Sequence, residues 1–223
     1  MNESSRTPRS TIKRLPQRAV YDRAAIDAIL DEGLVCHVGF SCDDRPFVIP
    51  TIYVRIGGQV YLHGSPASRM LQLLAKGGEA SIAVTLVDGL VLARSAFHHS
   101  INYRSVVLFG RGAAVDDDAQ KLSVLKALTD HIMPGRWSEV RAPSPDELRR
   151  TLVVSLPIEE ASAKVRIGPP LDDEPDYVLP VWAGVLPLKL SAFAPLPDAR
   201  LAEGILPPPY LADYTGPQGA VGG

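Results

Sequence analysis

Apolar residues recur along the chain in two periods, which predict many short strands with a few helices between them. Alternating or β-branched apolar runs predict strands, and a period of 3.6 residues predicts helices. The helix over 21–32 has Asp22 as a plausible N-cap and ends at Gly33. The expected strands cover 34–40, 47–56, 60–63, 80–87, 90–97, 103–114 and 151–163, with turns at Gly57-Gly58 and Asp88-Gly89 and a bend at Gly110.

Three further helices are expected at defined places between these strands. They cover 68–77 and 119–132 and a short stretch opened by Ser144-Pro145-Asp146-Glu147, which has the pattern of a capping box. Strand and helix do not alternate regularly, so a parallel doubly wound sheet is disfavoured. The pattern predicts a mainly β fold, a small antiparallel barrel with α decorations.

The composition divides the chain into three parts. We expect a polar, flexible N-terminal arm over 1–18, one barrel domain over 19–188 and an irregular tail over 189–223. Residues 165–223 hold eleven of the 20 prolines, and none of these lies in a periodic apolar pattern. Trp182 is the strong apolar anchor expected in this region.

Charge and cysteine content exclude several classes of protein. Hydrophobic residues make up 46% of the chain, and 23 basic against 25 acidic residues give a net charge of −2. This balance disfavours binding to nucleic acid or to a membrane surface. Cys36 and Cys42 are expected to be a buried and a surface thiol. No apolar leader or membrane-length run occurs, so we expect a soluble cytoplasmic protein.

The first candidate site is the stretch from Val60 to Arg69, where a strand runs through a Gly-containing turn into a helix. Free backbone N–H groups at such a junction favour an anion, and Arg69 supplies a planar cation for phosphate. Ser65 and Ser68 can donate hydroxyl hydrogens. The alternative is a capped helix with a surface arginine.

The second candidate stretch, 93–105, is rich in hydrogen-bond donors. His98 and His99 point to opposite sides of an extended chain, so they form a poor chelate and no metal site is expected. Arg94 and Arg104 could converge on one anion. Acidic runs at 116–118 and 172–174 are explained by capping and solvation. Because no nucleophile or phosphate-loop motif occurs, any catalysis would belong to a cofactor.

Four pieces of the sequence carry a resemblance to a known family. They are Arg18 to Asp22, the Tyr61 to Arg69 stretch, Asn102 to Gly110, and Trp182 to Val185. On these pieces the chain resembles the pyridoxamine 5'-phosphate oxidase-like flavoproteins, in particular the branch of the nitroimidazole-resistance reductases, over residues 14 to 188. The resemblance implies an FMN-binding split β-barrel that forms a homodimer, with flavin mononucleotide (FMN) in a cleft between the subunits.

The resemblance also implies roles for particular residues. Ser68 and Arg69 would contact the FMN phosphate, and His63, Gly64 and Ser65 would lie along the ribityl chain or ring. Ser105, after Arg104, resembles a polar residue that contacts the flavin. Trp182 resembles a tryptophan that the partner subunit lays near the flavin ring, and Lys164 is a further cofactor candidate. His63 is also the candidate substrate-side group.

The expected function is that of an FMN-dependent oxidoreductase that acts on a small oxidised substrate. A hydride would come from NADH, NADPH or another donor. The chain does not show the full set of basic residues with which the oxidases grip a vitamin B6 phosphate, which argues against that substrate. One alternative is a non-catalytic flavin or haem binding protein, with His98, His99 or His131 as the axial haem ligand. Another is an interaction domain with an empty cleft.

Overall fold

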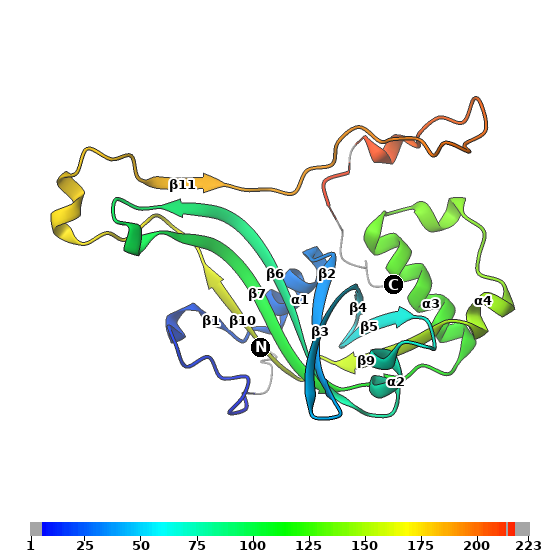
Figure 1. Ribbon diagram of the computed structural model, residues 1–223. Helices are drawn as coiled ribbons and strands as arrows, with labels where there is room; N and C mark the ends of the chain where they lie inside the picture. The colour runs from blue at the N-terminus through cyan, green and yellow to red at the C-terminus, as the bar shows by residue number, and fades with distance from the viewer. Residues whose placement is uncertain (1–5, 213, 217–223) are drawn as a thin grey trace.

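The chain folds into two antiparallel sheets, described over residues 6–212 and 214–216 in a computed structural model (Figure 1). This is the mainly β split-barrel architecture that the sequence predicts. The larger sheet has the order β1-β10-β7-β6-β2-β3, and β11 pairs with β6; the smaller has the order β4-β5-β9-β8. The strands are β1 Ala19–Val20, β2 Val35–Cys42, β3 Arg45–Ile52, β4 Val54–Ile56, β5 Gln59–Gly64, β6 Glu79–Leu92, β7 Ser100–Arg111, β8 Ala113–Ala114, β9 Leu152–Pro157, β10 Glu160–Arg166 and β11 Gly184–Pro187.

The helices begin at the polar caps that the sequence indicates. Asp22, Asp117 and Ser144 each accept a backbone N–H of the first helical turn, and Ser144 forms a complete capping box with Glu147. Within the described ranges, no helix combines the length and apolar character needed to cross a membrane. The helices are α1 Arg23–Glu32, α2 Arg69–Ala75, α3 Asp118–Ile132 and α4 Pro145–Arg149, with 3₁₀ turns η1 Pro16–Arg18, η2 Ala96–His98, η3 Arg136–Glu139, η4 Glu174–Val178 and η5 Pro209–Leu211.

Three apolar runs that read as single strands each divide between the two sheets. The run 47–56 breaks at Tyr53, whose fully buried ring separates β3 from β4. The run 103–114 breaks at Gly112 and not at Gly110, because only there does the backbone pass so close to Leu74 that a Cβ would lie 2.5 Å from its carbonyl oxygen. The run 151–163 divides between β9 and β10.

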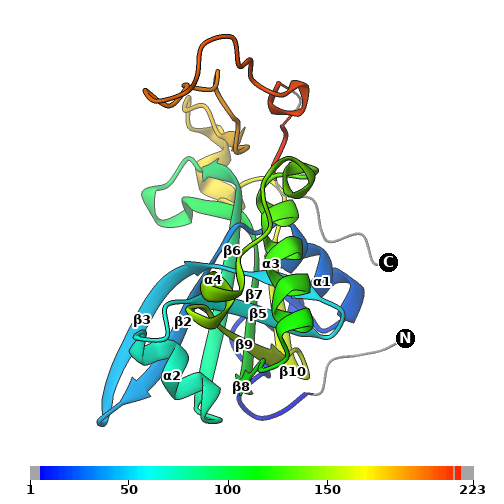
Figure 2. The ribbon, with the colours of Figure 1, turned by 90° about the vertical axis from the view of Figure 1, so that its right-hand side faces the viewer.

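Two clusters of buried side chains hold these elements together. The main core lies between the two sheets, α1 and α2, and includes Ile26, Leu62 and Leu108. A smaller cluster joins α3 to β4 and β9 through Val124 and Val153. Figure 2 shows α3 beside the small sheet, where this helix braces the barrel.

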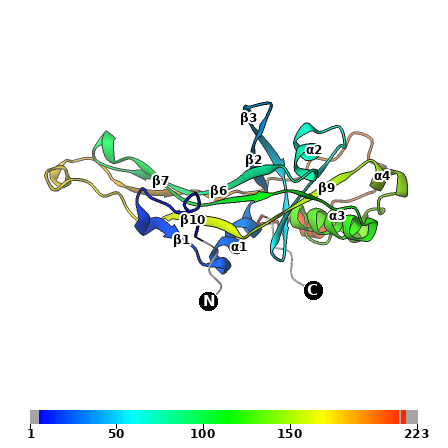
Figure 3. The same ribbon diagram turned by 90° about the horizontal axis from the view of Figure 1, so that it is seen from below.

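The strands β6 and β7 extend past the barrel as a long hairpin arm (Figure 3). The expected turn at Asp88-Gly89 is wrong: β6 continues through it, with a bulge between Val87 and Gly89. A side chain at Gly89 would meet Leu186 and Val185 of β11 at 3.0 Å. The glycine therefore lets β11 pack against the arm.

Both end segments contact the body where they are described. Arg9 pairs with Glu79 and Glu160, and the Ile12 amide donates to the Tyr21 hydroxyl at 2.9 Å. The irregular region after residue 165 contains one strand, β11, that the prolines did not predict. Trp182 is not an anchor, because its side chain is 68% exposed. Residues 1–5 of the expected arm, and 213 and 217–223 of the expected tail, lie outside the described residues.

Candidate functional site

The junction between β5 and α2 has the local structure that the sequence predicts. Ser65 turns the chain by accepting the amide of Ala67 at 3.2 Å, and its carbonyl oxygen accepts the amide of Ser68 at 2.9 Å. The Ser68 hydroxyl then caps α2 by accepting the Leu71 amide at 3.4 Å. Both hydroxyl groups act here as acceptors, so each keeps its hydrogen for a ligand.

Arg69 lies beside a surface hollow of about 440 Å³ that also contains Lys76. Its guanidinium stacks over the Phe47 ring at 4.6 Å from the centroid, which fixes the side chain without neutralising its charge. Among the described residues, no carboxylate pairs with Arg69 or Lys76. The hollow therefore presents two unneutralised cations, which is the electrostatic requirement for a phosphate site.

A second hollow, of about 560 Å³, continues from the first and shares Leu73 and Gly78 with it. Phe47, Val48 and Phe109 form apolar walls. The lining on β2 and β6 contains small residues together with Phe40, and the ion pair of Arg9 and Glu79 also lines this hollow. Gly39 on β2 approaches Ser81 on β6 so closely that a Cβ there would lie 2.7 Å from the serine hydroxyl. Together the two hollows combine apolar walls, small residues on β2 and β6, and a cationic end. We define them as the cationic groove.

His63 is the penultimate residue of β5 and does not line the cationic groove. Its Nδ1 is buried and has no hydrogen-bond partner among the described residues. Burial lowers the pKa of this imidazole, so the ring is neutral at neutral pH. His63 is thus a neutral nitrogen base with one unsatisfied atom, whereas Gly64 continues β5 opposite Leu152.

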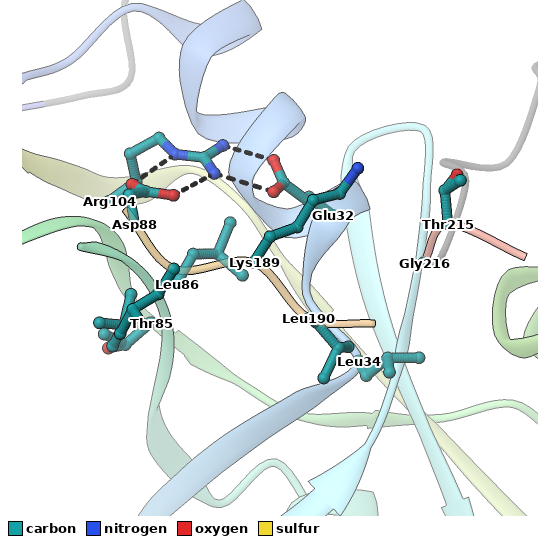
Figure 4. A pocket seen from close by; sticks show the side chains of 12 residues that line it. Glu32, Leu34, Thr85, Leu86, Asp88, Arg104, Lys189, Leu190, Thr215 and Gly216 are labelled. Atoms are coloured by element: carbon teal, nitrogen blue, oxygen red, sulfur yellow. Dashed lines mark hydrogen bonds and ion pairs between the residues drawn. The ribbon is translucent and has the colours of Figure 1, made fainter. Parts of the chain in front are cut away.

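Arg104 faces a different pocket, of about 460 Å³, on the other side of the sheet (Figure 4). Its guanidinium is held by Glu32 and by Asp88, whose oxygens lie 2.7 and 3.0 Å from its nitrogens. The hydrogen bonds that Arg104 donates, first to Glu32 and then to Asp88, raise its pKa above the usual value. Because both carboxylates already occupy its donors, Arg104 is a structural clamp between α1 and the arm.

The structure separates Arg104 from the other predicted cofactor residues. Ser105 points to the opposite face of β7, where its hydroxyl donates to the Lys164 carbonyl at 3.3 Å. The Lys164 ammonium donates to the Arg14 carbonyl at 3.2 Å. Ser105 and Lys164 therefore pair across β7 and β10 beneath the N-terminal arm. Trp182 lies apart from both, beside Gly184 at the start of β11.

At the tip of the arm, Asp172 joins the tail to the arm through hydrogen bonds that the sequence did not reveal. We call this contact the Asp172 lock. The Asp172 carboxylate accepts the backbone amides of Arg94 and Ser95 at 2.9 and 3.3 Å and pairs with the Arg94 guanidinium at 3.1 Å. Burial alone would raise its pKa, but these hydrogen bonds hold the pKa below its ordinary value. Arg94 and Arg104 thus have separate partners and do not converge. The role of Asp172 could not be predicted from the sequence, because an acidic run in a loop ordinarily indicates solvent-exposed side chains.

The histidines of this region differ in which ring nitrogen is engaged. His98 Nε2 lies 3.2 Å from Asp173, and His99 Nδ1 lies 2.9 Å from the Ser95 carbonyl. A carbonyl only accepts, so His99 carries its hydrogen on Nδ1 and, when neutral, has a free lone pair on Nε2. His131 is buried, and its Nε2 bonds the Gly33 carbonyl at 2.8 Å. Among the described residues, no group of three or more potential metal ligands gathers.

The family model described as pyridoxamine 5'-phosphate oxidase matches residues 22–165, which is more than half of the chain. The chain belongs to the pyridoxamine 5'-phosphate oxidase family. This confirms the resemblance stated on the four sequence pieces. A comparison with curated proteins finds no match.

Some solved structures are similar to this chain over more than residues 22–165. The flavocytochrome Anf3 from Azotobacter vinelandii is 41% identical, with a TM-score of 0.86, and the match covers 93% of this chain and 97% of that one. The FAD and haem binding protein from Mycobacterium smegmatis is 37% identical, with a TM-score of 0.84, over 90% and 98%. A protein from Bacteroides thetaiotaomicron named for 5-nitroimidazole antibiotic resistance is 21% identical, with a TM-score of 0.56, over 66% and 86%. This last likeness shows a common fold alone.

Proposed function

We propose that this family member is a flavocytochrome, which binds a flavin and a haem and passes electrons between them and a small substrate. The observation that carries the proposal is its similarity to the A. vinelandii flavocytochrome over 93% of the chain, at 41% identity. The M. smegmatis relative, named for FAD and haem, supports the same pair of cofactors. Flavin accepts two electrons and releases them singly, and haem carries one, so the pair suits such transfer.

The cationic groove fits a flavin. Arg69 and Lys76 are the residues that would hold phosphate, and hydroxyl hydrogens of Ser65 and Ser68 lie at the same junction. The small residues on β2 and β6 and the Phe47 side wall leave room for a planar ring. The sequence predicted FMN, whereas the name of the M. smegmatis relative favours FAD. We propose FAD, whose second phosphate and adenosine would use more of the groove.

His99 is the residue that best fits an axial haem ligand. Histidines that bind a metal usually donate their other ring N–H to a carbonyl or carboxylate, which fixes the free nitrogen toward the metal. His99 has this arrangement through the Ser95 carbonyl, and exposed apolar side chains surround the arm tip, among them Phe97 and Val178. His131 fits poorly, because its ring is buried in the protein, where a haem has no access to its free nitrogen.

His63 is proposed as a polar group on the substrate side, because it does not line the cationic groove. Its neutral ring can accept or donate one hydrogen bond, and its unsatisfied Nδ1 indicates that the local packing lacks a partner. A homodimer with a shared cleft is part of the proposal. The exposed Trp182 supports it, because a residue that is 68% exposed just before β11 is free to contact a second subunit.

The absorption spectrum tests the proposal. Protein expressed with added haem precursor should show a flavin band near roughly 450 nm and a Soret band near roughly 400 nm. Flavin released by heat, separated by chromatography before and after phosphodiesterase treatment, distinguishes FAD from FMN. Anaerobic titration with NADH and with NADPH then identifies the donor. A colourless protein that gains neither band with added flavin and haemin would contradict the proposal.

Matched substitutions test the two binding assignments separately. Arg69→Ala should weaken flavin binding at least about tenfold and leave the Soret band intact, because it removes one charge-assisted contact. His99→Ala should abolish or shift the Soret band and leave the flavin band intact, whereas His98→Ala should preserve both. A Soret band that persists in His99→Ala would exclude His99 as the ligand.

A further inference from the structure

A segment near the start of the chain contributes to the wall of the cationic groove. We define the N-terminal segment as residues 6–12. Its Arg9 lines the second hollow together with Glu79. Glu79 directly follows Gly78, a residue that both hollows share, so this carboxylate lies at the junction with the hollow that contains Arg69. The charge carried by Arg9 and Glu79 therefore bears on the place proposed for phosphate.

Arg9 neutralises two carboxylates that belong to the large sheet. Its Nε donates to the Glu160 carboxylate of β10 at 2.8 Å, its Nη2 donates to the same carboxylate, and its Nη1 donates to Glu79 of β6. Arg111 is a second cation near Glu79, with its Nη2 3.8 Å from a carboxylate oxygen. These two arginines and two glutamates cancel one another, so the net positive charge of the groove comes from its α2 side.

Without Arg9 the same groove would carry uncompensated negative charge. The hydrogen bond from Arg9 is the first cause that holds the pKa of Glu79 below its ordinary value. A glutamate at its ordinary pKa is still ionised at neutral pH, so loss of Arg9 would leave this carboxylate charged. Like charges within about a Debye length, roughly 8 Å in physiological salt, repel one another appreciably. A phosphate beside Arg69 would therefore be disfavoured.

The N-terminal segment is folded so that Arg9 is held in this position. The Thr7 amide donates to the Ser10 hydroxyl at 2.9 Å, and the Thr11 amide donates to the Thr7 carbonyl at 3.0 Å, which closes a turn around Arg9. The Arg9 guanidinium lies over the Phe109 ring, 4.8 Å from its centroid. Phe109 is a wall of the groove, so stacking and charge together fix Arg9 against that wall.

The arrangement differs from an isolated surface ion pair, which contributes little to stability. Arg9 joins β6 to β10, two strands that lie on opposite sides of β7 and do not pair with each other. Its ring contact, Phe109, belongs to the β7 strand between them. One side chain thus links three strands at the groove, and its consequence lies in the charge of the groove.

We propose that Arg9 is a positioning residue of the flavin site, which lets the cationic groove accept a flavin phosphate by neutralising Glu79 and Glu160. It acts through these carboxylates and does not have to touch the flavin. This inference rests on the proposed flavin site and adds a residue that determines its affinity for phosphate. Arg9 lies outside residues 22–165, the part that the family model matches, so family membership does not assign this role.

Affinities for three flavins test the proposal. Binding of FAD, FMN and riboflavin to cofactor-free protein is measured at low salt by quenching of flavin fluorescence. Riboflavin lacks phosphate, so it reports the contacts of the ring and ribityl chain alone. Arg9→Ala should weaken FAD and FMN binding at least about threefold and leave riboflavin binding unchanged, because only a phosphate is repelled by the uncovered carboxylates. Added salt should reduce the difference.

Further variants separate charge from packing. The triple variant R9A, E79Q and E160Q should regain the FAD affinity of the wild type, because the repelling carboxylates are gone. Arg9→Lys should regain part of it, since it keeps the charge and loses the planar fork. Arg6→Ala is the matched control: Arg6 stacks over Tyr21 at 3.9 Å in the same segment but lines neither hollow. Circular dichroism and thermal unfolding without flavin confirm that each variant folds.

Three results would overturn the proposal. They are an equal loss of affinity for all three flavins in Arg9→Ala, an unchanged affinity for FAD in that variant, and a triple variant that does not regain it. Inorganic pyrophosphate separates this inference from the proposed function. If the wild type binds pyrophosphate but no flavin, and Arg9→Ala weakens that binding, the flavin assignment fails while the role of Arg9 stands. A wild type that binds neither pyrophosphate nor flavin would overturn both.

Discussion

At the scale of single residues, burial decides which of the chemically reactive side chains can act. Cys36 is fully buried on β2, whereas Cys42 at the end of that strand is partly exposed, as the sequence predicted. Burial raises the pKa of the Cys36 thiol to about 12. The reactive thiolate is therefore both suppressed and shielded at this position.

We predict that one thiol reacts in the folded protein. At pH 8 a thiol-reactive dye should modify Cys42 and leave Cys36 unmodified until denaturant is added, when both should react. Absorbance of the released dye counts the thiols, and peptide mapping identifies them. Two equivalents released rapidly from native protein would contradict the burial of Cys36.

His63 predicts a dependence of stability on pH. Its folded-state pKa is lowered by burial from an ordinary value of 6.5. The unfolded chain therefore takes up this proton more readily, so the contribution to stability is present above about pH 6.5 and is lost as pH falls through the folded-state pKa. Urea unfolding at pH 7.5, 6.5 and 5.5 should show a smaller pH dependence in His63→Gln than in the wild type. The same substitution at exposed His37 is the control, and equal changes in both variants would contradict this assignment.

Sequence reasoning located the charged residues but could not pair them. Arg69 was predicted to contact a phosphate, and its local junction places it without a carboxylate partner among the described residues. Arg104 has the same residue type in an equally polar stretch, yet Glu32 and Asp88 neutralise it. Those partners come from α1 and from the β6 bulge, so only the assembled sheet brings them together.

At the scale of elements, local chemistry fixes where helices begin. At α4 we predict how much the N-cap contributes to the free energy of unfolding. Ser144→Ala removes the side-chain acceptor of a complete capping box that holds this five-residue helix. The free energy of unfolding in urea should fall by about 1 kcal/mol. Ser123→Ala on the exposed face of α3 is the control and should change it by less than about 0.5 kcal/mol. A cost no larger than that of the control would show that the box is dispensable.

The Asp172 lock predicts how the tail is attached to the arm. Asp172→Ala removes the acceptor of two backbone amides and of the Arg94 guanidinium. Amide hydrogens of Arg94 and Ser95 should exchange faster, and β11 should lose protection with them. Asp173→Ala, at a carboxylate that is 79% exposed and contacts only His98 in the described structure, should have little effect. Unchanged exchange in Asp172→Ala would show that β11 holds without the lock.

The element boundaries show what pattern alone can and cannot predict. Caps and apolar faces gave α1, α3 and α4 closely, because these signals lie within a few residues. The runs 47–56 and 151–163 each appeared as one strand, since hydrophobic alternation continues through Tyr53 and through the β9–β10 connection. Which sheet a strand joins depends on distant partners, and β11 formed only because β6 offers it an edge.

At the scale of the whole molecule, the fold places the cationic groove between elements that unfold together. Arg69 comes from α2, the floor from β2 and β6, and one wall from β3, so the groove exists only in the native state. A flavin bound there stabilises the native state in proportion to the logarithm of its free concentration. Thermal unfolding can therefore detect flavin binding without any assay of activity.

We predict that adding FAD to cofactor-free protein raises the midpoint of thermal unfolding. At 100 times the dissociation constant the gain is about 2.7 kcal/mol, which for a chain of this length is a rise of roughly 5–10 °C. Arg69→Ala should shift the response to at least about tenfold higher FAD concentrations, because a phosphate contact is lost. Lys126→Ala is the control, since Lys126 pairs with Asp130 on α3, away from the groove. If FAD and FMN both leave the midpoint unchanged, the groove is not a flavin site; if FMN alone raises it, the mononucleotide that the sequence predicted is the cofactor.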